Sequence, residues 1–470
     1  MHRRTARSIR GRDLLIAVML FALAMWQFLA AVDDEPLDRD EARSIHRVVY
    51  VQQLSNPFGP FWDEAAWQRR DASLDENNRL RDQPPFASYL LGVGLFAQGR
   101  DLSTNGFWIM ERDVAWNSAY GNAPEASDLA AARRTVAVVA ALTVVVAYAL
   151  GRRLTNRIGG LVTALYVAIH PLVGFYAAFA SADMLLVLLV ALAAVAAGRL
   201  ADRPTWPRAL LLGALIGLGG ATKLSPLLVA VPLALLGGMV LVAVMFGTRH
   251  RKEAAMPPPR LGWQLLSVPL VAGAVFVGAY PYLWSNPVTN TKAMFAFRRM
   301  GMELQSTTWD HLAVPYPREA FRRVGIRLGD HWTVLSNFSA ELDARFGVVW
   351  DTRGIELALA AAGGVMLLAL VIRAGLWSGH ALIATVLLSQ ATITVLGLRV
   401  DFARYHLPIM LLVAVALGVL AGQGWTALRL LWPMRSPLPT PDSRTVVQKE
   451  DLMTSLPGER LGNARERARG

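Results

Sequence analysis

Long runs of apolar residues separated by short polar segments dominate the pattern of this chain. A membrane-spanning helix needs about 20 mainly apolar residues, and most of the runs approach that length instead of repeating with a short amphipathic period. We therefore predict an all-α polytopic membrane protein with about ten transmembrane helices. The predicted spans lie near residues 14–32, 135–150, 159–180, 184–200, 209–221, 224–246, 261–283, 355–372, 376–398 and 405–424.

The first run, 14–32, follows a basic start at residues 1–13, as a secretory signal peptide would. The apolar core of a signal peptide is usually about 7 to 15 residues long and ends at a small-residue cleavage site. This run instead continues through Met25, Trp26 and Phe28. It is interpreted as a retained signal anchor with a cytoplasmic N-terminus.

Alternate crossing from a cytoplasmic start places two long loops outside, at about 33–134 and 284–354. Short basic segments favour the cytoplasmic side of a membrane. That side receives 151–157, 198–208, 247–252 and the Arg-containing tail 433–470. We expect a multi-pass protein of the plasma (inner) membrane with both termini cytoplasmic. The tail, rich in Pro, Ser, Arg and Glu, is predicted to be disordered.

Composition excludes an ordinary soluble enzyme, because 54% of the residues are hydrophobic and 17% are charged, against about 25% charged in a typical soluble domain. There is no cysteine, which excludes a disulfide framework, a thiolate metal site and a cysteine nucleophile. A net charge of +12 is compatible with nucleic acid, but the basic residues gather mainly at the ends of apolar runs. Anionic lipid phosphate is therefore the expected partner, and nucleic acid is not.

An acidic segment follows the first span directly. Its acids are Asp33, Asp34, Glu35, Asp38, Asp40 and Glu41. The apolar spacing beyond them, through residue 52, predicts a helix packed on the membrane surface. Asp40 and Glu41 would lie at its N-terminus, where the helix dipole keeps carboxylates ionised. Such a carboxylate can act as a general base, and paired acids can bind a divalent cation; a solvated acidic loop is the alternative.

A second segment places Asp82, Gln83, Pro84 and Pro85 before a short apolar stretch, 86–97. The prolines predict the start of a helix. Twelve residues are too few to cross about 30 Å of hydrocarbon, so this helix is expected to lie along the interface or dip into it. A proline-capped interfacial helix without chemistry is the alternative.

Polar side chains recur at the predicted outer ends of the spans, and their recurrence on one side indicates a lined cavity. They are Ser181, Asp183, Thr222, Lys223, Arg399, Asp401, Arg404, Tyr405 and His406. Snorkelling at helix ends is the alternative, especially for Arg399 and Arg404. Lys223 interrupts an otherwise apolar run, a position typical of a phosphate clamp.

The second long loop mixes Arg with apolar residues at 292–305 and 318–328, which predicts interfacial helices. They can serve membrane adhesion alone, or also steer a lipid phosphate toward the site. No P-loop, HExxH motif, plausible GxSxG elbow or Cys/His zinc spacing occurs in the sequence. We predict no metal site and no obligatory cofactor, while a divalent cation stays possible.

These residues, in this order, resemble the GT-C superfamily of polytopic glycosyltransferases, especially the branch of protein O-mannosyltransferases and bacterial lipid A aminoarabinose transferases. Asp40 and Glu41 resemble the acidic motif in the first external loop of that group. The segment 82–85 resembles its (H/D)xPP motif, and 132–186 its core spans with the acid Asp183. Further matches are the Gly-rich turn with Lys223 and a late Arg-Tyr motif at Arg404 and Tyr405.

The resemblance covers roughly 14–425, which would form the transferase domain between the basic start and the tail. It implies an inverting glycosyltransferase that takes a sugar from a polyprenyl-phosphate donor at the external membrane face. Asp40 would be the general base, Glu41 would orient it or contact the acceptor, and Lys223 and Arg404 would bind the donor phosphate. The substrate cavity would include Asp82, Pro84, Pro85, Asp183 and Tyr405.

The chain departs from the family pattern at Gln83, where the usual residue is His. It also lacks the soluble sugar-binding domain of the eukaryotic enzymes, which favours a bacterial type. The acceptor, whether protein, lipid or glycan, stays open. The competing hypothesis is a secondary transporter or lipid flippase with Asp183, Lys223 and Asp401 as a relay, although no internal repeat supports it. A nonenzymatic scaffold is a third alternative.

Overall fold

The computed structural model describes residues 2–33, 35–70, 73–247 and 258–431. By its contacts the chain divides into two units, Met1–Gln423 and Gly424–Gly470. The predicted disordered tail, 433–470, lies outside the described residues, as does most of the basic segment 247–252.

The described residues form helices and no β-strand, apart from one isolated bridge between Ala313 and Val400. The longer apolar elements are α1 (His2–Ala30), α8 (Ala126–Leu154), α9 (Arg157–Ile169), α10 (Pro171–Ala177), α11 (Asp183–Asp202), α12 (Trp206–Gly220), α13 (Ala230–Gly247), α14 (Pro259–Gly278), α18 (Ile355–Ala374), α19 (Gly379–Gly397) and α20 (Leu407–Leu431). The long loops contain α2 (Arg39–His46), α3 (Tyr50–Gln53), α4 (Leu74–Asn77), α5 (Arg79–Asp82), α6 (Phe86–Ala97), α7 (Val114–Ala119), α15 (Pro287–Thr308), α16 (Pro317–Ile326) and α17 (Val334–Phe346).

Eight helical segments among the described residues are long and apolar enough to cross a membrane, and nine if α9 and α10 form one span bent by 62°. The bend coincides with His170 and Pro171, as expected where proline interrupts a helix. α12 has only 15 residues. The ion pair between Lys223, just after α12, and Asp183, the first residue of α11, nevertheless shows that α12 retraces α11. The chain is thus an all-α polytopic membrane protein, as predicted.

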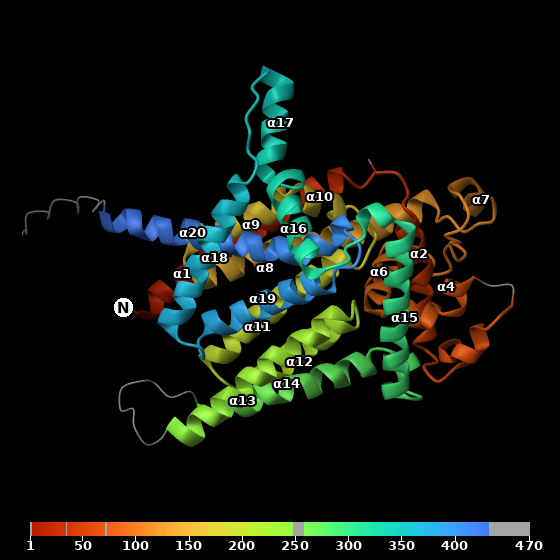
Figure 1. The fold of residues 1–470 in the computed structure, drawn as a ribbon, viewed down its shortest axis with the longest axis horizontal. Helices are drawn as coiled ribbons and strands as arrows, with labels where there is room; N and C mark the ends of the chain where they lie inside the picture. The colour runs from red at the N-terminus through yellow and green to blue at the C-terminus, as the bar shows by residue number, and fades with distance from the viewer. Residues whose placement is uncertain (1, 34, 71–72, 248–257, 432–470) are drawn as a thin grey trace, which may run out of the picture. The chain divides into compact units, whose positions relative to one another are not determined.

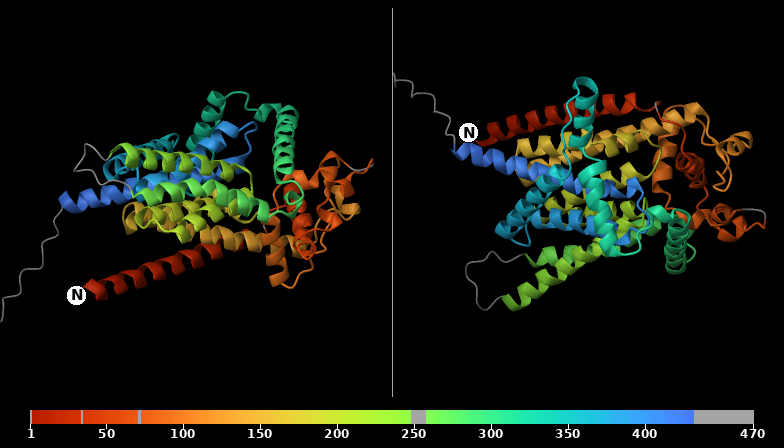
Figure 2. Two further views of the ribbon diagram at one scale, coloured as in Figure 1. Left: turned by 90° about the horizontal axis from the view of Figure 1, so that it is seen from below. Right: turned by 45° about the horizontal axis from the view of Figure 1, so that its top comes forward.

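The long helices of the first unit run roughly side by side, with α2 to α7 gathered at one end of them (Figures 1 and 2). α8 packs against α1, α9 and α11, while α11 also contacts α12 and α19. In α11, 78% of the apolar stretch is buried inside the protein. Close packing uses small residues: a Cβ at Gly418 would clash with the side chain of Thr163 in α9. The ion pair between Lys223 and Asp183 holds the polar ends of α11 and α12 together at one end of the bundle.

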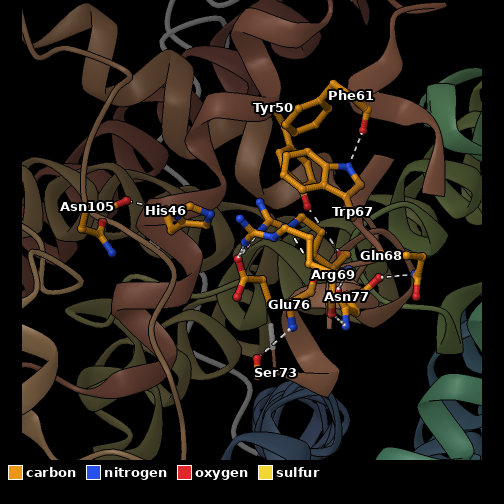
Figure 3. Close-up of polar contacts among 11 residues, drawn as sticks. His46, Tyr50, Phe61, Trp67, Gln68, Arg69, Ser73, Glu76, Asn77 and Asn105 are labelled. Carbon is orange, nitrogen blue, oxygen red and sulfur yellow. Dashed lines mark hydrogen bonds and ion pairs between the residues drawn. The ribbon is translucent and has the colours of Figure 1, made fainter. Parts of the chain in front are cut away.

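The first long loop is an ordered set of short helices around an aromatic cluster. Tyr50 and Trp62 are buried there with Tyr280, which lies beyond α14. The indole of Trp67 donates to the carbonyl of Phe61 at 2.8 Å, next to a network of side chains that includes Arg69, Glu76 and Asn77 (Figure 3). This cluster connects the loop to the end of α14.

The second long loop forms α15 and α16 where interfacial helices were expected, followed by α17, which the sequence pattern did not predict. Backbone hydrogen bonds connect this loop to the segment before α20. The amide of Val314 donates to the carbonyl of Arg399, and the amide of Asp401 donates to that of Leu312, each at 2.8 Å. The loop therefore reaches the same end of the bundle as α2.

A pair of adjacent glycines in α18 tests this packing. A Cβ at Gly363 would overlap the backbone of Ala416 in α20, whereas a Cβ at Gly364 would meet open space. We expect Gly363→Val to destabilise the protein by about 1–3 kcal/mol through overpacking, measured as a lower thermal unfolding midpoint in detergent. Gly364→Val is the control, because it carries the same β-branched side chain in the same helix. Equal midpoints for both variants would contradict the α18–α20 contact.

Candidate functional site

The acidic segment begins α2 with a capping box. The carboxylate of Asp38 accepts from the amide of Asp40 at 2.7 Å, and the carboxylate of Glu41 accepts from the amide of Asp38 at 3.2 Å. Asp40 and Glu41 lie in the first turn of the helix, where the pattern predicted them. Their carboxylates have different surroundings.

Glu41 is fully buried and engaged in a two-pronged ion pair with Arg133 of α8, with N–O distances of 2.8 and 2.7 Å. One oxygen of Glu41 also accepts from the amide of Ala180 at 2.8 Å. Arg133 in turn donates to the carbonyls of Val32, Glu35 and Pro36. Glu41 therefore connects α2 to α8 and to the turn before α11.

Asp40 forms an ion pair with Arg404, in the turn before α20. The side chains remain 31% and 21% exposed, respectively, so both are open to a ligand. Burial alone would raise the pKa of Asp40, but the positive charge of Arg404, with those of Arg39 and Arg43, outweighs it and lowers the pKa. In this arrangement Asp40 is an ionised carboxylate held by a cation.

A second carboxylate–cation pair lies at the start of α11. The ammonium of Lys223 pairs with Asp183, whose other oxygen accepts from the hydroxyl of Ser181 at 2.9 Å. Asp183 is 4% exposed and Lys223 is 22% exposed. The cation thus faces outward from a buried carboxylate.

Tyr405 brings the two pairs together. Its ring centroid lies 5.7 Å from the Lys223 ammonium, 5.6 Å from the Arg404 guanidinium and 5.9 Å from that of Arg298. Arg298, from α15, also donates to the Tyr405 hydroxyl at 2.7 Å. Three cations from three separate segments therefore surround one aromatic side chain, and cations attract phosphate as well as aromatic faces.

Arg298 was not among the predicted site residues. Its segment, 292–305, was expected to be interfacial and a candidate for steering a lipid phosphate, but the neighbouring Arg299 carries the same charge. Arg299 is 83% exposed and pairs with Glu303. Only the rotation of α15 relative to Tyr405 distinguishes the two arginines, and no local signal reports it.

The (H/D)xPP-like segment lies next to this cluster. Asp82 pairs with Arg47, which also donates to Gln83 at 2.8 Å. Burial would raise the pKa of Asp82, but Arg47, with smaller effects of Arg43 and Arg298, lowers it.

Pro84 and Pro85 are buried at the start of α6. The amide of Phe86 donates to the carbonyl of Ala221 at 2.9 Å, two residues before Lys223. The start of α6 is therefore connected to the turn that carries Lys223. Their place in a substrate cavity stays a prediction.

Asp401 and His406 are both buried and face each other across the turn that carries Arg404. The Asp401 carboxylate lies 2.7 Å from Nε2 of His406 and 3.2 Å from Arg327, just after α16. These contacts position the Arg404 turn. Among the described residues, no three His, Asp or Glu side chains are grouped as metal ligands would be.

Comparison with known proteins supports the resemblance. Residues 115–271 match the sequence profile of the family described as dolichyl-phosphate-mannose-protein mannosyltransferase. This range includes Asp183 and Lys223, but not Asp40 or Arg404. A search of curated proteins gave no match. The resemblance to the protein mannosyltransferase branch is thus confirmed over that range.

Among solved structures, ArnT from Cupriavidus metallidurans bound to undecaprenyl phosphate aligns at 17% identity and a TM-score of 0.47, over 87% of this chain and 60% of its own. The archaeal oligosaccharyltransferase AglB from Archaeoglobus fulgidus, in complex with an inhibitory peptide and a dolichol-phosphate, aligns at 13% identity and a TM-score of 0.47, over 93% of this chain and 54% of its own. The chain spans little more than half the length of these two proteins.

The Glu41–Arg133 pair provides a stability test. Removing one partner of a buried ion pair typically costs about 3–5 kcal/mol, because the other charge stays buried without compensation. We expect Glu41→Gln to destabilise the protein by that order, measured by thermal or denaturant unfolding in detergent. Glu111→Gln, at an exposed glutamate of the same loop, should leave stability unchanged. A Glu41→Gln variant as stable as the wild type would contradict this role.

Proposed function

We propose that this protein is a membrane glycosyltransferase that moves a sugar from a polyprenyl-phosphate donor to an acceptor at the external membrane face, with inversion. One observation carries the proposal: Lys223, Arg298 and Arg404 converge on Tyr405 while Arg404 also holds Asp40. This transfer requires cations that stabilise the anionic leaving group and a base that takes the proton of the acceptor. The matched mannosyltransferase profile supports the same reaction class.

In the proposed reaction an acceptor hydroxyl or amine attacks the anomeric carbon of the sugar. The bond from that carbon to the phosphate oxygen breaks, and the lipid phosphate leaves with the electron pair. Asp40 takes the proton of the attacking group. Lys223, Arg298 and Arg404 stabilise the charge that grows on the phosphate. No metal is required in this scheme, since three cationic side chains serve a single phosphate.

The two ion pairs give this scheme an order. In the structure Arg404 is neutralised by Asp40 and Lys223 by Asp183. A donor phosphate competes with both carboxylates for the same cations. As Arg404 turns toward the phosphate, Asp40 loses the charge that lowers its pKa and becomes a stronger base. Donor binding therefore precedes and promotes deprotonation of the acceptor.

Glu41 has a positioning role in this proposal. It is fully buried and bound to Arg133 and Ala180, so it orients the helix that carries Asp40 and does not meet the acceptor. Asp183 likewise orients Lys223. Transport by a secondary transporter or flippase is the competing function, in which Asp183, Lys223 and Asp401 would form a relay.

Asp40→Asn tests the base. We expect transfer to fall by about 10²-fold or more, in the range of general-base catalysis, while donor binding is retained or tightened because a competing charge is gone. The assay follows release of sugar from a panel of radiolabelled polyprenyl-phosphate sugars by purified protein in lipid nanodiscs, with a membrane extract as acceptor source. Asp33→Asn, at an exposed acid of the same segment, is the control.

Retained turnover in Asp40→Asn would refute Asp40 as the base, and weakened donor binding would refute the competition between Asp40 and phosphate. If folded wild-type protein releases no sugar from any donor in a broad panel, the transferase proposal fails and transport becomes the favoured function.

Arg298→Gln tests the phosphate site. A charge-assisted hydrogen bond contributes about 1.5–3 kcal/mol, so we expect polyprenyl phosphate to bind about tenfold more weakly or worse, measured by competition against the labelled donor. Lys223→Ala should behave similarly. Arg299→Gln is the matched control, since it removes the same charge from an exposed position one residue away. Equal binding by the Arg298→Gln and Arg299→Gln variants would indicate only nonspecific attraction.

A further inference from the structure

The hairpin of residues 334–353, here called the α17 arm, has no part in the site described above. α17 ends at Gly347, whose φ of 64° reverses the chain. The hydroxyl of Ser339 donates to the carbonyl of Trp350 at 2.7 Å and holds the returning segment against the helix. The arm is thus an ordered projection.

The arm exposes large apolar side chains. They are Phe338 at 54%, Phe346 at 72%, Val348 at 52%, Val349 at 83% and Trp350 at 50% exposure. Phe338, Leu342 and Phe346 recur every fourth residue and so share one face of α17. Contiguous exposed apolar surface of this kind marks contact with a membrane or another protein.

The charged side chains of the arm are largely neutralised by local pairs. Arg345 pairs with Glu341 at 2.5 Å, and Arg353 pairs with Asp351 at 3.0 Å. These four charges therefore need no counter-charge from a partner. Arg345 lies seven residues after Phe338 and so near the apolar face of α17, where a paired basic side chain can extend to the lipid headgroups.

The base of the arm is connected to a lipid-facing helix. Glu356, in the first turn of α18, accepts from the amide of Leu335 at 3.1 Å and from the hydroxyl of Tyr166. Only 22% of the apolar stretch of α18 is buried inside the protein, so most of this helix is left to contact lipid. The arm thus leaves the protein at the level where a membrane-spanning helix begins.

The direction of the arm is also consistent with a position at the membrane surface. The ribbon shows α17 projecting sideways from the bundle, steeply inclined to α8 and α9 (Figures 1 and 2). Since those helices run across the membrane, a helix inclined in this way runs close to the membrane plane. A helix of 13 residues reaches about 20 Å at 1.5 Å per residue.

We propose that the α17 arm is a membrane-interface anchor, with Phe338, Phe346, Val349 and Trp350 inserted at the headgroup boundary of the leaflet on the Asp40 side. The partner is the lipid surface itself. Tryptophan is favoured at this depth because its ring is amphipathic. The anchor holds the second long loop, which also carries Arg298, at a constant level relative to the bilayer. This inference does not depend on the proposed transferase activity.

The absence of cysteine allows a direct test with single labels on the otherwise unchanged full-length chain. Phe346→Cys and Val349→Cys carry a bimane fluorophore on the proposed lipid side. Ala344→Cys is the matched control, because it is exposed and lies on the other side of α17 from Phe346. Each labelled protein is reconstituted in nanodiscs of phosphatidylglycerol and phosphatidylethanolamine at one chain per disc.

We expect the fluorescence of bimane at 346 and 349 to be quenched by lipids that carry a nitroxide in the upper acyl chain. We also expect bimane at these positions to be several-fold less accessible to an aqueous quencher than bimane at 344. Equal aqueous accessibility at the three positions would overturn the anchor. So would burial at 346 and 349 that appears only when several chains share a disc, because that result assigns the apolar face to a second copy. A near-wild-type melting midpoint confirms that each labelled variant is folded.

Discussion

The buried ion pair between Glu41 and Arg133 is the interaction on which the candidate site depends. Glu41 completes the capping box of α2, while Arg133 donates hydrogen bonds to three backbone carbonyls in the segment that follows α1. The same carboxylate accepts from Ala180, immediately before the turn that contains Asp183. One buried pair thus sets the positions of Asp40 and Asp183 relative to α8. Such a pair is costly to desolvate, and its value here is in geometry.

The site built on this foundation pairs most of its charged groups. Two carboxylates hold two cations, and Arg298 bonds to the tyrosine that all three cations surround. Two of the three cations are thereby neutralised, and an isolated ion would be costly in apolar surroundings. In the proposed reaction it also makes the cations available, because an incoming phosphate would compete with both carboxylates for them. The exposed sides of Asp40 and Lys223 face such an exchange.

The second long loop has two connections in this picture. Through Arg298 and Arg327 it contacts Tyr405 and Asp401, on either side of the Arg404 turn. Through the α17 arm it extends away from the bundle with an apolar surface. A loop tied to the Arg404 turn and, as proposed, anchored to the membrane has little freedom to leave the site. Both connections arise from side chains on opposite ends of one segment between α14 and α18.

Local patterns in the sequence determined much of this protein. Run length and apolarity determined the spans, and the apolar periodicity and the prolines determined where α2 and α6 begin. The isolation of a lysine in an apolar run marked Lys223 as unusual. These features depend on residues within a few helical turns of one another. Helix periodicity and the cost of placing polar groups in a membrane both act over that short range, so the sequence alone determines them.

Tertiary structure alone decided the partners. Asp40 meets Arg404 and Glu41 meets Arg133 across separations of 364 and 92 residues, so adjacent acids of one motif differ in burial, one partly exposed and one fully buried. It also selected Arg298 over Arg299, and turned α17 outward. Each of these outcomes depends on the rotation and relative height of packed helices. Those quantities come from many side-chain contacts summed over the whole bundle, and no local stretch of sequence contains them.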